Sequence, residues 1–468
     1  MKKEKGIRYD WANLRADLVG SGQGLTGADL EAHRERARTA VGKFLARVEK
    51  GEIGFPGLPF DIDPLEQVER YARARRGKYR SVLLLGIGGS ALGPFALDAA
   101  VNGPRPFRKK KVPAELLVLD NVDPLILRRA LEPLDPRQTL LLVITKSGST
   151  AETMSQFLIV YAWLRKKLGK KRAAARVAAV TDPKKGDLLA LAQKEGFALF
   201  AVPPNVGGRF SVLSPVGLLP AALVGVNVRR LLAGAGAIVE ACRRPEPEAN
   251  PALSAALHQY LLDTRYGKSI QVIYCYSNAL YPLAFWYRQL WAESLGKRVD
   301  RQQREVLCGQ TPIAALGVTD QHSQSQLYME GPRDKTFTFW EVEADPYTLR
   351  IPKLFPQHAA TGYLGGHTLN ELFHAEKFAS ELALTEAGRP NATFVFPRAD
   401  EHALGQFMML AMFQTAYAGE LYDVNAFDQP GVELGKQLTY ARLGRPGFDA
   451  ERARIASYQK QKDALTRG

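Results

Sequence analysis

The sequence predicts an α/β protein with two doubly wound parallel sheets, each covered by helices on both faces in three layers. Short apolar runs of strand length alternate with stretches of helix length, as is typical of parallel sheets. The alternation stops at a stretch rich in proline and glutamate, Arg243 to Glu248, and then restarts. The 468 residues also exceed the usual size of a single core. We therefore expect two domains.

Residues 1–75 carry helical patterning and are expected to form a lead-in that belongs with the second domain. The first domain is expected over residues 76–240, where five apolar runs are separated by segments of helix length. The predicted strands are Ser81 to Leu85, Glu115 to Leu119, Thr139 to Ile144, Arg176 to Val180 and Ala198 to Val202.

The second domain is expected over residues 241–439, with helices at Glu371 to Ala387 and His402 to Ala418. Its predicted strands are Ser269 to Tyr276, Gly317 to Thr319, Thr336 to Val342 and Ala392 to Phe396. Residues 440–468 are basic and compatible with a helix. They predict either an arm or a terminal helix that packs on its own subunit.

Composition excludes some classes of protein and leaves others open. Hydrophobic residues at 46% and charged residues at 24% are ordinary for a soluble globular protein. The net charge of +15 attracts nucleic acid, anionic lipid and phosphorylated small molecules alike. Because the basic clusters lack interleaved aromatic residues, we expect a solvated basic surface and no nucleic-acid partner.

The three cysteines and the absence of long apolar runs predict a soluble cytoplasmic protein. Cys242, Cys275 and Cys308 form no CxxC pair, which favours a reducing compartment and no thiolate metal site. No apolar run approaches the roughly 20 residues of a membrane helix, and no signal-peptide pattern follows the charged start. No membrane partner is expected.

The run GIGGSALGP, Gly86 to Pro94, follows the first predicted strand of the first domain and can turn backbone amides toward an anion. A dinucleotide site is the alternative, because Gly86, Gly88 and Ala91 satisfy GxGxxA. Asp120 weakens that alternative, since it comes 29 residues after Ala91 where about 20 is usual. A structural tight turn is the other possibility.

The run TKSGSTAET, Thr145 to Thr153, places hydroxyls around a glycine at a second strand-to-helix junction. Hydroxyls and helix amides bind phosphate, and Lys146 can either add charge or anchor the loop. An ordinary Ser/Thr helix cap is the alternative. We expect a phosphate site because the run Ser147 to Thr150 holds more hydroxyls than a cap requires.

Two further segments carry candidate catalytic groups. Arg209 follows two glycines and can either stabilise an oxyanion or cap a loop. Glu293 lies one turn after Gln289, near Tyr287 and Trp291. It is either a partly desolvated general base or the i,i+4 partner of Lys297.

Histidines and the last motif complete the candidate set. His322 lies in the polar run TDQHSQ, whose neighbours can orient its tautomer. His367 and His374 lack a third ligand nearby, so we interpret them as structural and expect no metal. The run FDQPGVELGK sets Gln429 and Lys436 among glycine and proline, which suits a polyhydroxylated anion.

Taken together, these segments resemble the glucose-6-phosphate isomerase family. The similar motifs are GIGGS, TKSGST, GGRFS, ESLGK with the upstream Gln289, TDQHS and DQPGVELGK, in family order from about Gly86 to Lys436. The resemblance implies two sugar-isomerase (SIS) domains and interconversion of glucose 6-phosphate and fructose 6-phosphate through a cis-enediolate. It implies no cofactor and no metal, since proton transfer needs neither. A non-catalytic sugar-phosphate regulator is the alternative, disfavoured because a sensor needs no base.

The resemblance also implies a role for each matching residue. Glu293 would move the proton between C2 and C1, Arg209 would stabilise the enediolate, and His322 with Lys436 would shuttle protons during ring opening. The phosphate would be held by Ser147, Ser149 and Thr150 with Lys146 in the loop, and the sugar by Gly89, Ser90, Gln289 and Gln429. A homodimer is implied, in which the neighbouring subunit supplies His322. Pro204 departs from the pattern, because an acidic residue is expected there.

Overall fold

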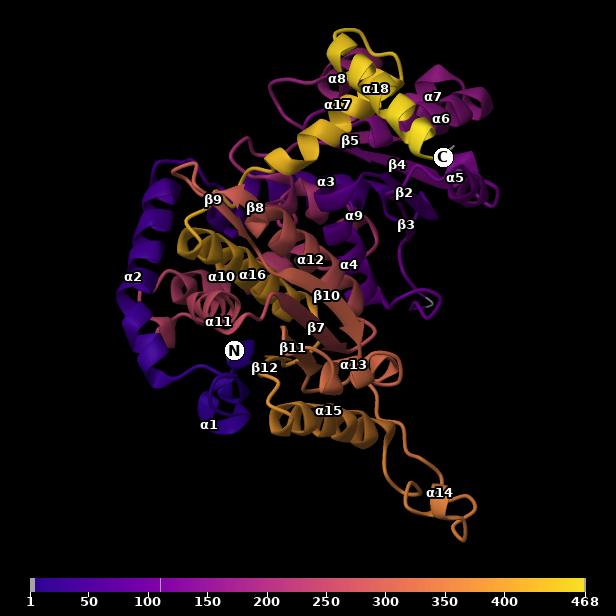
Figure 1. The fold of residues 1–468 in the computed structure, drawn as a ribbon. Helices are drawn as coiled ribbons and strands as arrows, with labels where there is room; N and C mark the ends of the chain where they lie inside the picture. Colours follow the sequence, from indigo (N-terminus) through magenta and orange to yellow (C-terminus); the bar gives the residue numbers. More distant parts are fainter. Residues whose placement is uncertain (1–4, 110, 467–468) are drawn as a thin grey trace.

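The computed structural model describes residues 5–109 and 111–466, which contain two five-stranded sheets (Figure 1). The first sheet is parallel throughout. Its spatial order is β3 (Glu115–Leu119), β2 (Ser81–Leu85), β4 (Thr139–Ile144), β5 (Val177–Thr181) and β6 (Ala198–Ala201). The order reverses between β2 and β4, and open α/β sheets bind ligands outside the carboxyl ends of strands at such a point.

The second sheet has four parallel strands and one antiparallel edge strand. Its order is β1 (Arg8–Asp10), β12 (Asn391–Phe396), β11 (Lys335–Val342), β7 (Ile270–Tyr276) and β10 (Thr311–Leu316). The predicted strand at Gly317 to Thr319 is wrong, because the strand is β10 and Thr319–Gln321 form a short 3₁₀ helix. A separate hairpin joins β8 (Lys297–Val299) to β9 (Glu305–Cys308).

Helices cover both faces of each sheet, which confirms the predicted three-layer α/β class. Those before residue 243 are α1 (Ala16–Val19), α2 (Gly27–Glu49), α3 (Ile62–Arg75), α4 (Leu92–Asn102), α5 (Pro124–Leu131), α6 (Ala151–Leu168), α7 (Lys170–Ala174), α8 (Asp187–Glu195), α9 (Pro215–Leu223) and α10 (Val228–Cys242). The later ones are α11 (Pro251–Tyr266), α12 (Tyr281–Leu295), α13 (Ser325–Glu330), α14 (Ala359–Gly362), α15 (Leu369–Glu386), α16 (Glu401–Leu421), α17 (Glu433–Arg442) and α18 (Asp449–Thr466). None of these described helices is long and apolar enough to cross a membrane.

The buried apolar side chains form one central core and two outer cores, because successive side chains of a strand point to opposite faces of its sheet. Val82 and Leu84 of β2 enter a central core that also holds Ile273 and Cys275 of β7, so this core lies between the two sheets. Leu83 and Leu85 enter an outer core formed with α5 to α8. An outer core on the far side of the second sheet contains Tyr274, Phe337 and Phe339. Helix α16 runs through the central core and is buried from residue 403 to 421.

The lead-in contacts both halves of the chain. Strand β1 pairs with β12 of the second sheet, and α2 packs against α16. Helix α3 instead packs against α9, and its Tyr71 meets Phe200 of β6 edge-on. The lead-in therefore packs on both sheets. We propose the domain boundaries 76–240 and 241–439, which the strand pattern indicates.

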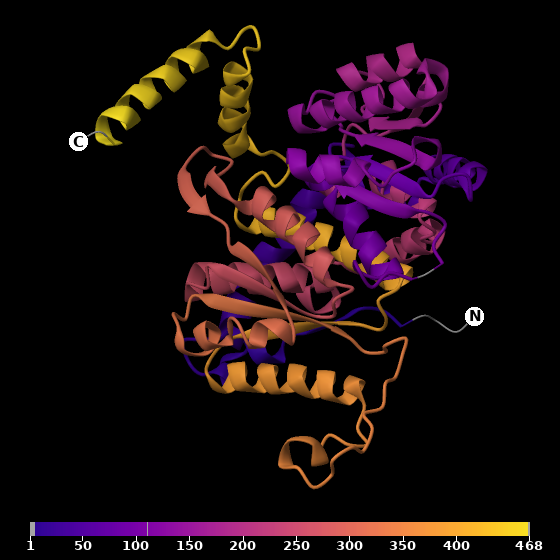
Figure 2. The ribbon, with the colours of Figure 1, turned by 90° about the vertical axis from the view of Figure 1, so that its right-hand side faces the viewer.

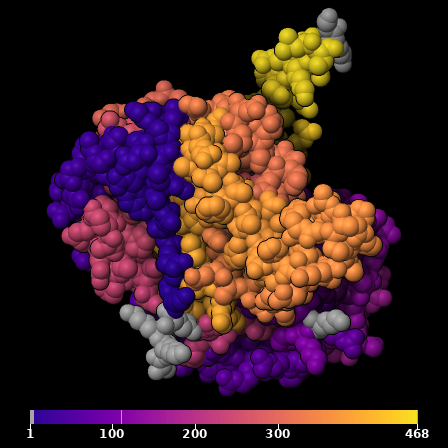
Figure 3. Space-filling view, turned by 90° about the horizontal axis from the view of Figure 1, so that it is seen from below, coloured from indigo at the N-terminus to yellow at the C-terminus, as the bar shows by residue number. Residues whose placement is uncertain are grey.

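Two segments project from the body of the protein. Helices α17 and α18 form an arm that stands away from both sheets (Figures 2 and 3), and α18 has no buried residue. Residues 345–368, which include α14, project beyond α15 (Figure 1). This projecting segment exposes apolar side chains, among them those of Tyr347, Leu354, Phe355 and Tyr363.

Candidate active site

The glycine loop after β2 touches two other motif segments. A Cβ atom on Gly88 would lie 2.7 Å from Nε2 of Gln289 on α12. A Cβ atom on Gly89 would collide with the backbone of Gly208 and Arg209. Only glycine permits this approach, so the loop is fitted to protein neighbours that are themselves motif residues. The dinucleotide alternative gains no support from these contacts.

The hydroxyl loop after β4 sits at the N-terminus of α6. The Thr145 hydroxyl oxygen lies 2.8 Å from that of Thr150 and 3.3 Å from that of Ser147. Thr150 is the N-cap residue, yet its side chain makes no capping hydrogen bond. The simple capping explanation therefore does not account for this hydroxyl. The positive end of the α6 dipole, backbone amides and hydroxyls therefore lie together, as they do in anion-binding sites at helix N-termini.

Lys146 anchors the loop. Its ammonium donates to the carbonyl oxygens of Pro204 at 2.7 Å and Val206 at 2.8 Å, and burial lowers the pKa of the amine. Of the two roles open for Lys146, the geometry favours the anchor. Pro204 replaces the expected acidic residue, but its carbonyl still holds the lysine, so the loop contact does not depend on a carboxylate.

Arg209 connects several segments of the candidate site, and its side chain is only 4% exposed. Its Nε donates to Ser294 Oγ at 2.7 Å, and one terminal nitrogen donates to the carbonyls of Ala426 and Asp428 at 2.7 and 2.9 Å. The other terminal nitrogen donates to Oε1 of Gln429 at 3.1 Å. Burial lowers the pKa of Arg209, and the carboxylates of Glu293 and Asp428 oppose that shift. The four hydrogen-bond partners hold the Arg209 guanidinium in a fixed position.

Glu293 lies between Gln289 and Arg209. Gln289 Nε2 donates to one carboxylate oxygen at 2.8 Å, and the Arg209 guanidinium lies 3.4 Å from the other. The carboxylate is 26% exposed, so it remains accessible. Pairing with Lys297 is wrong, because that ammonium contacts the Glu293 backbone carbonyl at 3.2 Å and the Asp428 carboxylate at 3.1 Å.

The predicted aromatic neighbours of Glu293 lie elsewhere. Tyr287 and Trp291 are buried and stack on each other in the core, with centroids 5.9 Å apart. They therefore fix α12 in the core, while its other face presents Gln289 and Glu293. Ser90 and Gly89 are in the 3₁₀ turn Gly88–Ser90 beside this face.

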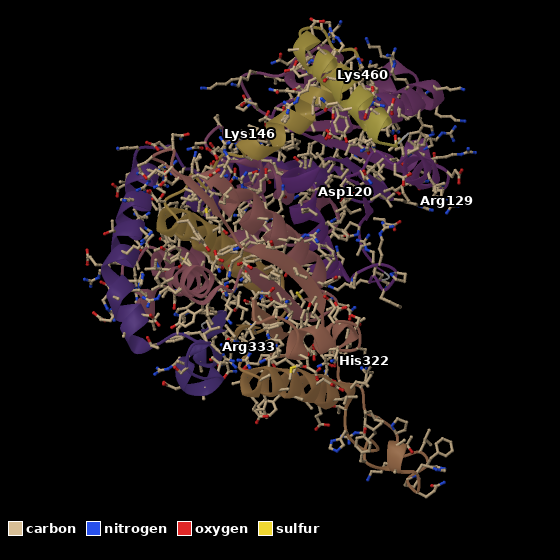
Figure 4. The ribbon with its side chains drawn as sticks, in the orientation of Figure 1. Asp120, Arg129, Lys146, His322, Arg333 and Lys460 are labelled. Atoms are coloured by element: carbon tan, nitrogen blue, oxygen red, sulfur yellow. The ribbon has the colours of Figure 1, made fainter. Side chains whose placement is uncertain are left out.

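Lys436 and His322 are not brought to this cluster within the chain. Lys436 lies on α17, is 47% exposed and pairs with Glu433 at 2.7 Å. His322 is exposed after β10, and it lies in the lower half of the molecule, well away from Lys146 in the upper half (Figure 4). The cluster formed by one chain thus contains Arg209, Glu293, Gln289 and Gln429.

His367 and His374, the two histidines considered as metal ligands, each lie beside a carboxylate. His367 Nδ1 lies 3.4 Å from Glu371, and His374 Nδ1 lies 3.0 Å from Glu341. No three His, Cys, Asp or Glu side chains come together as a metal-ion site in the residues that the structure describes.

Sequence reasoning missed Ser294 and Asp428, which hold Arg209 and Lys297. Ser294 is fully buried, and Asp428 contributes its carbonyl to Arg209 and its carboxylate to Lys297. Both lie inside motifs singled out from the sequence. The motifs thus contained both residues, but the sequence did not indicate which side chains the two residues contact.

A family model described as phosphoglucose isomerase matches residues 70–465. The chain belongs to the phosphoglucose isomerase family. The resemblance inferred from the six motifs is confirmed. Among members of the family, the glucose-6-phosphate isomerase of Carboxydothermus hydrogenoformans is 48% identical over 442 residues, covering 93% of this chain and 94% of that protein. That of Thermus thermophilus is 43% identical, covering 88% and 96%.

Two solved structures share the fold of this chain. A hypothetical protein from Thermus thermophilus superposes with a TM-score of 0.84 at 40% identity, covering 94% of this chain and 100% of that one. A glucose-6-phosphate isomerase from Chlamydia trachomatis has a TM-score of 0.83 at 20% identity, covering 98% and 92%. The second comparison shows the shared fold alone.

Proposed function

We propose that this protein interconverts glucose 6-phosphate and fructose 6-phosphate by proton transfer through a cis-enediolate. The observation that carries the proposal is the position of the Glu293 carboxylate between Gln289 and Arg209. The hydroxyl loop is tied to the same segment, because Lys146 binds the Val206 carbonyl just before Arg209. A base, a cation and an anion site match the needs of an aldose–ketose isomerase. Relatives named glucose-6-phosphate isomerase support it, and no observation favours the non-catalytic regulator.

The phosphate group is assigned to the loop at the N-terminus of α6. Ser147, Ser149 and Thr150 supply hydroxyls, and the first-turn amides of α6 supply donors. Lys146 acts through the loop, because its ammonium is already bound to two carbonyls. Gly89, Ser90, Gln289 and Gln429 line the sugar-binding side.

Glu293 is assigned the proton transfer between C2 and C1. It removes the proton from the carbon next to the carbonyl and returns it to the neighbouring carbon, so the carboxylate is regenerated. The negative charge that develops on the enediolate oxygens meets the Arg209 guanidinium. Because Arg209 is buried and held by four partners, little reorganisation is needed when that charge forms.

Ring opening is assigned to Lys436 and His322. Lys436 lies on α17, which begins shortly after Gln429 in the chain. Movement of this exposed helix toward Arg209 would bring the Lys436 ammonium to the sugar. His322 is assigned to a second subunit, because within one chain it lies far from Lys146 (Figure 4), whose ammonium contacts the segment just before Arg209. Neutral imidazole and ammonium can pass protons between the ring oxygen and the C1 hydroxyl.

A homodimer follows from this assignment. The exposed arm and the projecting residues 345–368 present apolar side chains that a second copy can cover. Each subunit would supply Glu293 to one site and His322 to the other. We place the enzyme in the cytoplasm, since all three cysteines are unpaired thiols.

Deuterium exchange tests the proposed reaction directly. Purified protein is incubated with glucose 6-phosphate in heavy water, without added metal or nicotinamide, and followed by NMR. We expect deuterium at C2 together with formation of fructose 6-phosphate. Binding of the sugar phosphate without exchange would contradict the isomerase and favour a sensor.

A further inference from the structure

Lys297 carries a buried ammonium beside the candidate active site, and the proposed reaction gives it no role. Its side chain is 5% exposed, and burial lowers the pKa of the amine. Lys297 begins β8 directly after Gly296, the C-cap residue of α12. Removing an ammonium from water is costly unless its donors are all used. The groups that it binds therefore indicate what it does.

The Lys297 ammonium joins the end of α12 to the segment before the arm. It donates to the Glu293 backbone carbonyl at 3.2 Å and to the Asp428 backbone carbonyl at 2.7 Å, and it lies 3.1 Å from the Asp428 carboxylate. Three acceptors thus meet its three donors. Glu293 lies in the last turn of α12, where carbonyls lack helical partners and a cation is favoured. One side chain therefore connects the backbone of the proposed base to Asp428.

The Asp428 carbonyl is shared by two cations. Lys297 and one terminal nitrogen of Arg209 donate to it at 2.7 and 2.9 Å, so both of its lone pairs accept from charged donors. The next residue, Gln429, accepts from the other terminal nitrogen of Arg209 at 3.1 Å. The position of Gln429 against Arg209 therefore depends on how Asp428 is held.

The chain leaves the body of the protein at this point. Ala426 is 1% exposed, whereas residues 430–437 are all exposed, and α17 of the arm begins at Glu433 (Figure 2). A cavity of about 740 Å³ lies between the β8–β9 hairpin and the segment 425–431. Because side chains do not fill this space, packing holds the segment weakly on that side. The polar contacts of Lys297 therefore carry more of the attachment.

We propose that Lys297 is a positioning residue that fixes the start of the arm, at Asp428, to the end of α12 that carries Glu293. Its contacts place Gln429 against Arg209 and give the arm a fixed point from which Lys436 reaches the sugar. Lys297 thus acts on the reaction through the residues that it holds. Only this effect on catalysis rests on the proposed function, because the attachment of the arm is a property of the protein without substrate.

The alternative is that Lys297 only stabilises the end of α12. A buried ion pair adds little net stability, because the loss of hydration offsets the attraction. A lysine that caps a helix also needs only the Glu293 carbonyl, whereas Lys297 makes two further contacts, both with Asp428. The two explanations differ in whether the effect of Lys297 passes through Asp428.

Lys268→Met is the matched control for Lys297→Met. Lys268 lies just before β7 and is 2% exposed, and its ammonium donates to the Gln23 side chain at 2.8 Å and to the Arg333 carbonyl at 2.7 Å. Each variant removes a buried ammonium together with its hydrogen bonds, so both should lower the urea midpoint of unfolding. Only Lys297→Met should loosen the start of the arm.

Hydrogen exchange of the full-length protein without substrate, followed by mass spectrometry, measures that loosening. Peptides covering residues 425–437 should exchange at least about fivefold faster in Lys297→Met and at an unchanged rate in Lys268→Met. With fructose 6-phosphate, kcat should fall about tenfold in Lys297→Met, as expected for a small displacement of site groups, and stay unchanged in Lys268→Met. KM should change less than about threefold, because Lys146 holds the phosphate loop independently.

Asp428→Asn tests the same contact from its other partner. The Asp428 side chain is 51% exposed, so this variant is expected to fold even if Lys297→Met does not. It should also speed exchange over residues 425–437. In the double variant Lys297→Met/Asp428→Asn, kcat should fall no further than in Lys297→Met alone, because both changes break one interaction. Independent, multiplicative effects would overturn the proposal and leave Lys297 as a cap of α12.

Exchange and turnover can fail separately. Unchanged exchange over residues 425–437 in Lys297→Met and Asp428→Asn would overturn the attachment, whatever the activity. Equal losses of kcat in Lys297→Met and Lys268→Met would overturn the positioning role. If the natural protein did not isomerise the sugar phosphate, the proposed function would fail, while faster exchange in Lys297→Met would still establish that Lys297 holds the arm.

Discussion

The guanidinium of Arg209 lies 3.4 Å from the carboxylate of Glu293 and 3.1 Å from the side-chain oxygen of Gln429. Arg209 follows the last strand of the first sheet, Glu293 lies on α12, and Gln429 precedes the arm. One cation thus joins three distant parts of the chain. Replacing Glu293 and replacing Arg209 should therefore affect catalysis in different ways.

Replacing Glu293 by Gln should abolish isomerisation while sugar-phosphate binding persists. The amide keeps the shape and the contact with Gln289 but cannot accept the carbon-bound proton. We expect kcat to fall by at least about a hundredfold, the usual contribution of a general base. Steady-state kinetics and calorimetric binding measure the two effects. Turnover close to that of the natural protein would remove Glu293 from the role of base.

Replacing Arg209 by Lys should lower both kcat and stability. Lysine keeps the charge but cannot serve the four partners that the planar guanidinium reaches. We expect kcat to fall about a hundredfold or more, and the free energy of unfolding to fall by about 2–4 kcal/mol. Urea unfolding and kinetics measure these changes.

Arg229→Lys is the matched control for Arg209→Lys. Arg229 is 56% exposed and pairs with Glu69 at the surface. Its replacement should change the free energy of unfolding by less than about 0.5 kcal/mol and leave kcat unaltered. Equal behaviour of the two variants would contradict a special role for Arg209.

Replacing Ser147 and Thr150 together by Ala should raise KM at least about tenfold with little loss of stability. The Thr150 hydroxyl does not cap α6, so its removal costs the helix little. Thr26 is the control, because it forms a capping box at α2 with Asp29. Thr26→Ala should lose about 1 kcal/mol of stability and keep its KM. If Ser147→Ala/Thr150→Ala behaves like Thr26→Ala, the loop is a cap and not a phosphate site.

His258 should make the protein less stable as the solution becomes acidic. It is 2% exposed, packs against the ring of Trp11 and contacts the Tyr9 hydroxyl at 3.3 Å, and burial lowers its pKa from 6.5 to about 3. Above pH 6.5 the imidazole is neutral in both states. Between pH 6.5 and 3 the unfolded chain binds a proton that the folded one excludes, so stability is lost as the pH falls.

The expected loss from His258 between pH 6.5 and 5 is roughly 2 kcal/mol. Urea unfolding at about pH 7 and about pH 5 measures it. His258→Phe should show a smaller difference between the two pH values, whereas His367→Gln, at an exposed position, should match the natural protein. An unchanged difference in His258→Phe would mean that other groups cause the acid sensitivity.

Subunit exchange should reveal a shared site. Glu293→Gln and His322→Gln are each expected to be inactive alone. If Glu293 and His322 of one site come from different subunits, each mixed dimer regains one intact site. An equal mixture refolded together should then reach about a quarter of the natural activity. A mixture that stays inactive, with mixed dimers demonstrated by mass spectrometry, would place both residues of a site in one chain.

The sequence was a good guide to regular elements whose residues match their environment. The run Thr139–Ile144 is entirely apolar apart from its first residue, and it forms a fully buried central strand as predicted. Strand β10 was missed because TPIAAL contains a proline and lacks a continuous β-branched run. It lies at the edge of its sheet, where a proline is tolerated.

The sequence marked segments that the fold brings together, but it did not indicate their contacts. The motifs GIGGSALGP and TKSGSTAET indicated binding loops, because closely spaced glycines and hydroxyl residues are uncommon inside helices and strands. The partner of Lys297 could not be read locally, since helical spacing pointed to the Glu293 carboxylate while the carboxylate of Asp428 lies 3.1 Å away. Long-range pairs of this kind depend on how the two halves of the chain come together.

The shared core between the two sheets limits how this protein can move. Separating the sheets would expose side chains such as Leu84 and Ile273 to water, at about 1.5–3 kcal/mol for each one. Opening of the molecule as two hinged bodies is therefore unfavourable. Motion during turnover is left to the parts outside the core, namely α17, α18 and residues 345–368. The entry and exit of substrate should accordingly follow the movement of the arm, while the Glu293 carboxylate and the Arg209 guanidinium stay in place.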